Sequence, residues 1–286
     1  MAVETDRPGE RRSDVERILH DVRRRPEVLR RNLLATRTLS ARRRRDLRFR
    51  LVPFTLFQIA NGAALVLTAG VLLAVLLDPH LVAWQATLPE GLTGFFDMVT
   101  DFGKSGWILI GTGVFFIVSL FLDAASLTAR QRVRRMLRTI AAAYVFLAVA
   151  ISGILINVVK LLFGRARPRL FEDEGSYSFD PLAADSDWAS FPSGHATTAM
   201  ALGAALALLF PRLRWVFLCL GFWIAMSRMF VRAHYPSDVL ADCLFGAVTA
   251  WLLARALAQR RLVFGFDAAG RLRRRRGVSG RVISDG

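Results

Sequence analysis

Long apolar segments separated by short polar ones dominate the sequence. Six of these runs lie at roughly 54–77, 105–122, 139–163, 196–211, 214–231 and 239–257. Several of them reach the ~20 residues that an α-helix needs to cross a bilayer. Helices are favoured because they satisfy their own backbone hydrogen bonds in lipid. The pattern therefore predicts an all-α polytopic membrane protein, built as a six-transmembrane-helix bundle.

Basic residues lie between the apolar runs, mostly on one side of the predicted membrane. The chain has 39 Lys and Arg against 23 Asp and Glu, a net charge of +16. Basic clusters precede the first run, separate the second from the third and the fourth from the fifth, and follow the sixth. The positive-inside rule then predicts that both termini are cytoplasmic. Segments 78–104, 164–195 and 232–238 are expected to be extracytoplasmic.

The same distribution argues against a nucleic-acid partner, because the charges do not form the single basic surface that a groove-binding domain presents. The two cysteines, Cys219 and Cys243, fall inside predicted spans. Neither favours a disulfide or a metal site.

Three parts are expected along the chain. They are a basic cytoplasmic N-terminal segment at 1–50, a six-helix membrane domain at 51–258 and a basic cytoplasmic tail at 259–286. Ser13 and Glu16 form a capping-box pattern ahead of a helical repeat that Pro26 ends. The first part is therefore predicted to be partly an amphipathic helix. Such a helix either lies on anionic lipid or serves only to fix the topology.

Polar residues gather at the outer ends of the third to sixth runs. The three groups are Lys160, Arg167 and Pro168; Pro192, Ser193, Gly194 and His195; and Ser227, Arg228, His234 and Asp238. Ser193 is a good N-cap, and the free amides of a helix N-terminus bind anions. Gly194 lets an anion approach the backbone closely. Cations and potential cations at one membrane surface predict a phosphate site, with His234 as a nucleophile.

Each group also has a structural explanation when it is taken alone. Lys160 can extend to the interface from a buried stem, Ser193 can simply cap a helix, and His195 can be an ordinary interfacial residue. Gly164 and Pro168 are expected to end the third helix.

The start of the last helix carries two acidic residues. Pro236 suits its first position and Asp238 its first turn, so a hydrogen bond from Asp238 to the imidazole of His234 is feasible. Asp242 lies one turn deeper. It is expected either to pair with Arg228 or Arg232, or to be exposed near the interface.

The flanking segments are less specific. Segment 169–191 is acidic and aromatic, and it either covers the site or is a solvated loop. An interfacial aromatic belt is predicted at Trp84, Phe95, Phe96 and Trp107. Solvated positions are expected at His80, Asp97 and Asp101.

Together the three polar groups closely resemble the signature of the type 2 phosphatidic acid phosphatase superfamily, over roughly residues 54–258. The resemblance implies a metal-independent lipid phosphatase of a bacterial inner membrane, with no cofactor and an extracytoplasmic site. Its substrate would be a lipid phosphate or diphosphate, such as undecaprenyl diphosphate, phosphatidylglycerol phosphate, phosphatidic acid or a lipid A phosphate.

The resemblance also assigns roles to individual residues. His234 would attack phosphorus and form a phosphohistidine, and Asp238 would hold its tautomer. His195 would protonate the leaving oxygen and later activate water. The phosphoryl oxygens would be bound by Lys160, Arg167, Ser193, Gly194 and Arg228.

Two alternative functions remain at this point. A lipid phosphotransferase would pass the phosphoryl group from the same intermediate to a lipid acceptor. A noncatalytic lipid-binding or transport protein would keep the fold, although the intact His195, His234 and Asp238 argue against it. Relatives that hold vanadate and oxidise halides are expected to be soluble, which six spans count against. The sequence names no protein partner.

Overall fold

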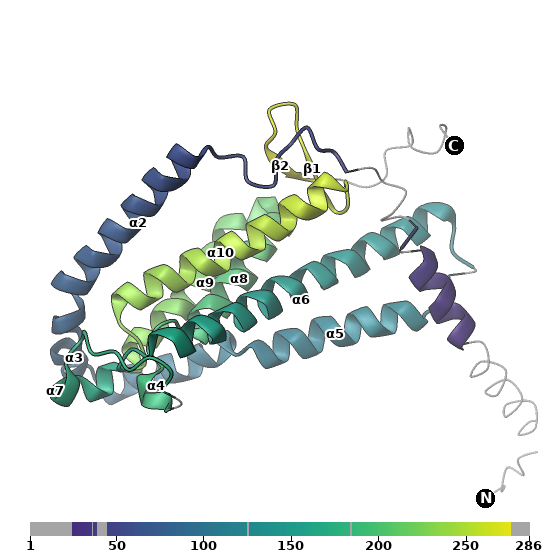
Figure 1. The fold of residues 1–286 in the computed structure, drawn as a ribbon. Helices are drawn as coiled ribbons and strands as arrows, with labels where there is room; N and C mark the ends of the chain where they lie inside the picture. Colours follow the sequence, from purple (N-terminus) through teal and green to yellow (C-terminus); the bar gives the residue numbers. More distant parts are fainter. Residues whose placement is uncertain (1–24, 36, 39–44, 125, 184, 276–286) are drawn as a thin grey trace, which may run out of the picture.

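The computed structural model describes residues 25–275 apart from 36, 39–44, 125 and 184 (Figure 1). The predicted capping box at Ser13 and the last residues of the basic tail lie outside this part of the chain.

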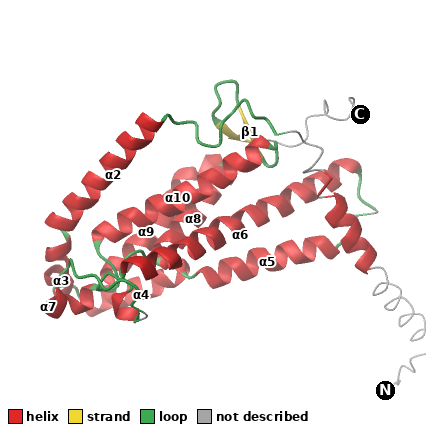
Figure 2. Cartoon of the chain, viewed as in Figure 1, coloured by secondary structure: helices red, strands yellow, loops and turns green. Residues whose placement is uncertain are grey.

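Six long helices form the bundle, as the apolar pattern predicts (Figures 1 and 2). They are α2 (Leu56–Leu76), α5 (Ser105–Phe121), α6 (Ala129–Phe163), α8 (Gly194–Leu209), α9 (Arg214–Phe230) and α10 (Pro236–Gln259). Five helical segments of the described chain are long and apolar enough to cross a membrane, and α8 is shorter, with 16 residues. The protein is therefore a multi-pass membrane protein.

Shorter elements close the two ends of the bundle (Figure 1). The helices at one end are α3 (Asp78–Ala86), α4 (Glu90–Thr100) and α7 (Phe171–Glu174). The 3-10 turns are η1 (Asp101–Gly103), η2 (Pro168–Leu170), η3 (Ser186–Trp188) and η4 (Pro211–Leu213). At the other end β1 (Phe264–Phe266) and β2 (Leu272–Arg274) form an antiparallel hairpin.

Helix α8 lies at the centre of the bundle, where ten of its 16 residues are buried. Small residues let α9 and α10 approach it closely. A Cβ at Gly246 of α10 would lie 2.5 Å from the carbonyl oxygen of Thr197, and one at Gly221 of α9 would lie 2.9 Å from that of Ala199. These contacts hold the first half of α8 against the middle of α9 and of α10.

The outer helices expose apolar side chains to the lipid. Helix α2 lies at the edge of the bundle beside α10 and has no buried residue (Figure 1). Trp84, Phe95 and Trp107 are exposed, as an interfacial belt requires. The prediction for Phe96 was wrong, because this ring is buried and stacks on Phe230 with 3.8 Å between centroids. The packing of α4 against α9 removes it from the interface.

The ends of the helices follow the sequence signals. Gly164 ends α6 in the left-handed conformation, with φ 55°. A Cβ there would lie 1.7 Å from the carbonyl oxygen of Asp180, so only glycine fits. Ser193 caps α8 by accepting a hydrogen bond from the amide of Ala196, and Pro236 opens α10.

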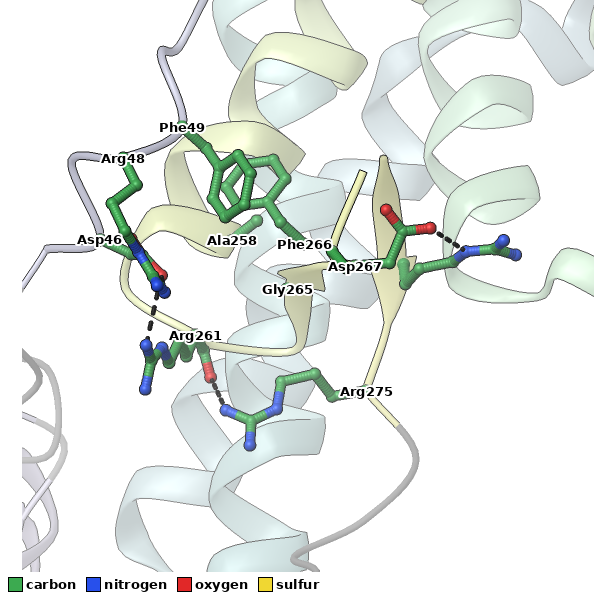
Figure 3. Close-up of a pocket in the computed structure, with 11 residues that line it drawn as sticks. Asp46, Arg48, Phe49, Ala258, Arg261, Gly265, Phe266, Asp267 and Arg275 are labelled. Carbon is green, nitrogen blue, oxygen red and sulfur yellow. Dashed lines mark hydrogen bonds and ion pairs between the residues drawn. The ribbon is translucent and has the colours of Figure 1, made fainter. Parts of the chain in front are cut away.

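The hairpin was not predicted, and it ties three parts of the chain together. Arg274 donates to the carbonyl of Leu209 at the end of α8. Gln259 of α10 donates to the carbonyl of Phe49 at 2.9 Å. The ring of Phe49 packs at a tilt against that of Phe266 (Figure 3). Part of the expected basic tail is therefore packed against the bundle.

Candidate active site

The bundle brings the polar helix ends together. Lys160 lies in the last turn of α6 and Arg228 in the last turn of α9, while His195 and Asp238 lie in the first turns of α8 and α10. All four helix ends lie at the end of the bundle that carries α3, α4 and α7 (Figure 1). His234 occupies the short link between α9 and α10.

His234 is buried, with 2 % of its surface exposed. Its Nδ1 forms a hydrogen bond with the carbonyl oxygen of Ser190. Because a carbonyl oxygen only accepts, Nδ1 carries the proton and Nε2 keeps its lone pair. Burial, followed by the charges of Arg228 and Arg167, lowers the pKa of His234 well below 6.5. The ring is therefore neutral at neutral pH.

Asp238 does not form the expected hydrogen bond with His234 in the described structure. Its carboxylate accepts from Arg165 Nη1 at 2.5 Å, from Ser190 Oγ at 2.7 Å and from the amide of Tyr235 at 3.1 Å. At its position in the first turn of α10, these three donors occupy the carboxylate. Ser190 connects the two residues, through its hydroxyl to Asp238 and its carbonyl to His234.

Arg165 is the centre of a buried ion-pair network that the sequence did not reveal. Its Nη2 donates to Asp78 Oδ2 at 2.8 Å, and its guanidinium lies 4.3 Å from the centre of the Tyr235 ring. Asp78 also accepts from the hydroxyl and the amide of Ser237, at 2.5 and 3.2 Å. Burial acts to lower the pKa of Arg165, but the charges of Asp238 and Asp78 outweigh it and raise the pKa. The network fixes the start of α10 to the end of the first span.

Two arginines near His234 each have a hydrogen-bond donor without a partner in the described structure. The Nε groups of Arg167 and Arg228 are buried and have no hydrogen-bond partner among the described residues. Arg228 is held by Thr100 of α4, whose hydroxyl accepts from Nη1 at 2.8 Å. Burial, and then the charge of Arg169, lowers the pKa of Arg167. Buried donors of cationic side chains that lack a partner favour the binding of an anion.

The start of α8 is held by Asp242. The prediction for this residue was wrong, since it is fully buried and its Oδ2 accepts from the amide of Ser193 at 3.0 Å. The close contact at Gly246 explains this, because it brings α10 beneath the cap of α8. Its other oxygen, Oδ1, has no partner in the described part of the chain.

His195 packs against the turn that precedes α5. A Cβ at Gly103 would lie 3.0 Å from the carbonyl oxygen of His195 and 3.1 Å from its Cβ. Asp101 and Lys104 form an exposed ion pair of 2.7 Å in the same turn. His80, Asp97 and Asp101 are exposed, as predicted.

The described residues contain no group of three or more His, Cys, Asp or Glu placed to hold a metal ion. Cys219 and Cys243 are free thiols.

A buried histidine and cationic residues at the helix ends of a membrane bundle are the arrangement expected of a membrane protein that binds phosphate groups. The profile of the PAP2 superfamily matches residues 141–262. A lipid A 1-phosphatase from Rhizobium johnstonii is 39% identical over 198 residues, which cover 69% of this chain and 80% of the relative. The chain belongs to the PAP2 superfamily, and it is a membrane phosphatase of that family.

Two further similarities are more distant. The undecaprenyl-diphosphatase BcrC of Bacillus subtilis is 33% identical over 106 residues, 37% of this chain and 52% of the relative. A solved transmembrane PAP2-type phosphatidylglycerolphosphate phosphatase from Bacillus subtilis has a TM-score of 0.47 and 18% identity. It covers 66% of this chain and 92% of its own.

Proposed function

We propose that this protein hydrolyses a lipid phosphomonoester or diphosphate at the extracytoplasmic membrane surface, through a phosphohistidine at His234. The observation that carries the proposal is the arrangement at His234. A buried neutral imidazole with its Nε2 lone pair free lies within the field of Arg167 and Arg228, whose Nε donors have no partner in the described structure.

In the first step, His234 Nε2 attacks phosphorus as the bond between phosphorus and the leaving oxygen breaks. His195 gives its proton to that oxygen. Arg167, Arg228 and Lys160 bind the phosphoryl oxygens, together with Ser193 and Gly194 at the start of α8. These fixed cations stabilise the developing charge, so the proposed reaction requires no metal.

In the second step, His195 takes a proton from water, and the resulting hydroxide displaces His234 from phosphorus. The products are phosphate and the free imidazole. Phosphorylation leaves a positive charge on the ring of His234, whose Nδ1 continues to donate a hydrogen bond to the carbonyl oxygen of Ser190. Asp238 is therefore a positioning residue, which holds Ser190 through its hydroxyl.

The relatives support an order of preference among the candidate substrates. A lipid A 1-phosphatase shares 39% identity over most of its length, whereas the undecaprenyl-diphosphatase matches over about half of its length. We therefore place the 1-phosphate of lipid A first among the candidate substrates and undecaprenyl diphosphate second. Phosphatidylglycerol phosphate and phosphatidic acid complete the panel.

The test is phosphate release by the purified full chain in detergent with EDTA, across these lipids. His234→Ala is compared with His80→Ala, a control that removes an exposed histidine. We expect release that survives EDTA, persists in the control and is lost in His234→Ala. Release abolished by EDTA would contradict metal independence.

The same assay distinguishes the two alternatives. Transfer of phosphate only when an acceptor lipid is supplied would identify a phosphotransferase. No reaction with any lipid, alone or with an acceptor, would favour a binding or transport protein.

A further inference from the structure

A polar cavity, shown in Figure 3, lies beside the hairpin, at the end of the bundle opposite to α3, α4 and α7 (Figure 1). It has a volume of about 610 Å³, is open on one side, and is lined by the segment before α2, the end of α10 and the hairpin. Its charged lining residues are Asp46, Arg48, Arg261, Asp267, Arg273 and Arg275.

The cavity is separated from the active site by the length of α10. Asp238 lies in the first turn of this helix, and Ala258 of the cavity lies in its last turn. The 24 residues of α10 span about 36 Å at 1.5 Å per residue. The cavity therefore lies at the opposite membrane surface, at the depth of the lipid headgroups.

The charge of the lining is positive even after its internal ion pairs are counted. Four arginines and two aspartates give +4 and −2, a net charge of +2. Asp46 accepts from Arg48 at 2.8 Å and also from Arg261 at 3.2 Å. Asp267 likewise accepts from Arg271 and Arg273. Each carboxylate is thus already shared between two cations.

Arg275 forms no ion pair with Asp46 or Asp267 in the described structure. Its Nη1 donates to the backbone carbonyl of Arg261 at 3.0 Å, as Figure 3 shows. Burial and the charge of Arg261 lower the pKa of Arg275. An anion that binds between a half-buried guanidinium and another cation forms charge-assisted hydrogen bonds and relieves their repulsion.

The walls of the cavity are held by backbone contacts. The amide of Asp46 donates to the carbonyl of Gln259 at 2.7 Å, and the amide of Arg275 donates to that of Val263 at 2.9 Å. The rings of Phe49 and Phe266 pack at a tilt beside the charged groups, with 4.8 Å between ring centroids. The arginines are therefore presented by a fixed frame.

We propose that this cavity binds a phosphate group, which the phosphodiester headgroup of an anionic membrane lipid supplies at this surface. Free phosphate is the other source of the same chemistry. The proposal does not depend on the phosphatase reaction.

The alternative is that the arginines attract anionic lipid without forming a site. In that case each basic residue near the surface adds a similar ~1 kcal/mol, wherever it lies. Arg134 is a matched control, because it is exposed on α6 near the same membrane surface and does not line the cavity. Arg275→Gln and Arg134→Gln make the same change in net charge.

The experiment measures binding of short-chain phosphatidylglycerol to the full chain in a neutral detergent, by native mass spectrometry. This lipid is a phosphodiester, so it is not a substrate of a phosphomonoesterase. We expect Arg275→Gln to weaken binding roughly tenfold, the loss of one hydrogen bond to a charged group, while Arg134→Gln binds like the unchanged protein. Arg275→Lys checks folding and is expected to bind with intermediate affinity.

Inorganic phosphate is titrated in parallel. Arg275-dependent binding of inorganic phosphate would support the site with a soluble source. Equal losses in Arg275→Gln and Arg134→Gln, or binding that neither substitution changes, would overturn the proposal.

Discussion

The guanidinium of Arg165 donates to Asp238 at 2.5 Å, and both side chains are buried. This ion pair fixes the position of the Asp238 carboxylate. In the described structure Asp238 pairs with Arg165 and is connected to His234 through Ser190. The catalytic histidine of the proposed mechanism is thus supported by a network that extends to Asp78 at the end of the first span.

The first prediction concerns Asp78. Asp78→Ala leaves Arg165 with one buried carboxylate instead of two, which is expected to cost on the order of 3–5 kcal/mol of unfolding free energy. We also expect kcat to fall more than KM rises, because the start of α10 loses its anchor. Asp78→Glu is expected to recover part of kcat.

The control is Asp187→Ala, which removes an exposed ion pair with Arg169. Exposed pairs contribute about 0–1 kcal/mol, so its stability and kcat should change little. Equal effects of the two substitutions on denaturation and on kcat would contradict a special role for the buried network.

The pH dependence of kcat/KM tests the protonation state of His234. Its pKa lies well below 6.5, so the attacking lone pair is lost only as the pH falls far below that value. The unfolded chain binds the proton more readily, so this group also reduces stability as the pH falls below 6.5. Arg167→Gln removes a nearby positive charge and should raise the pKa of His234. The acidic limb of kcat/KM should then move to higher pH; an unmoved limb would show that Arg167 does not act on the ring.

Asp242 is predicted to order the phosphate-binding turn. Asp242→Ala leaves the buried amide of Ser193 without an acceptor, at a cost of about 1–3 kcal/mol. We expect this to raise KM roughly tenfold. Asp242→Asn keeps an acceptor oxygen and should bind substrate nearly as well as the unchanged protein. A lower KM in either variant would mean that the carboxylate mainly repels the substrate.

Gly103 provides a test of the position of His195. A methyl group at this residue would lie 3.0 Å from the His195 carbonyl and displace the proposed general acid. We expect Gly103→Ala to lower kcat about 10- to 100-fold with little change in KM. Gly106→Ala is the matched control, since a Cβ there has nothing within 4 Å. Kinetics with one lipid substrate would compare them, and equal kcat values would exclude this constraint.

The sequence predicted much of the fold because lipid imposes a simple rule on helix length and composition. All six runs became helices, and the signals at Gly164, Ser193 and Pro236 marked their ends. The hairpin was missed because its six strand residues are surrounded by arginines, which resembled a topological tail.

The candidate site was only partly predictable. The motif residues stand out because they are polar at the ends of apolar runs. Arg165 does not stand out in the sequence, because it lies among other basic residues. Asp78 precedes Pro79 and therefore resembles an ordinary turn residue. Arg165 and Asp78 are 87 residues apart in the chain, so their ion pair could not be predicted from local spacing. Asp242 and Asp238 were found, but their partners depend on helix rotation and on the Gly246 contact, which spacing alone does not define.

The most direct measurement is the search for phosphate on His234. His195→Gln removes the proposed base for the second step, and an aryl phosphate supplies a leaving group that needs no proton. Rapid quenching at high pH, followed by mass spectrometry of the peptide, should show phosphate on His234 in this variant. No phosphate should be found in the double variant with His234→Ala. Phosphate release by the aryl phosphate reaction without any label on His234 would contradict the account.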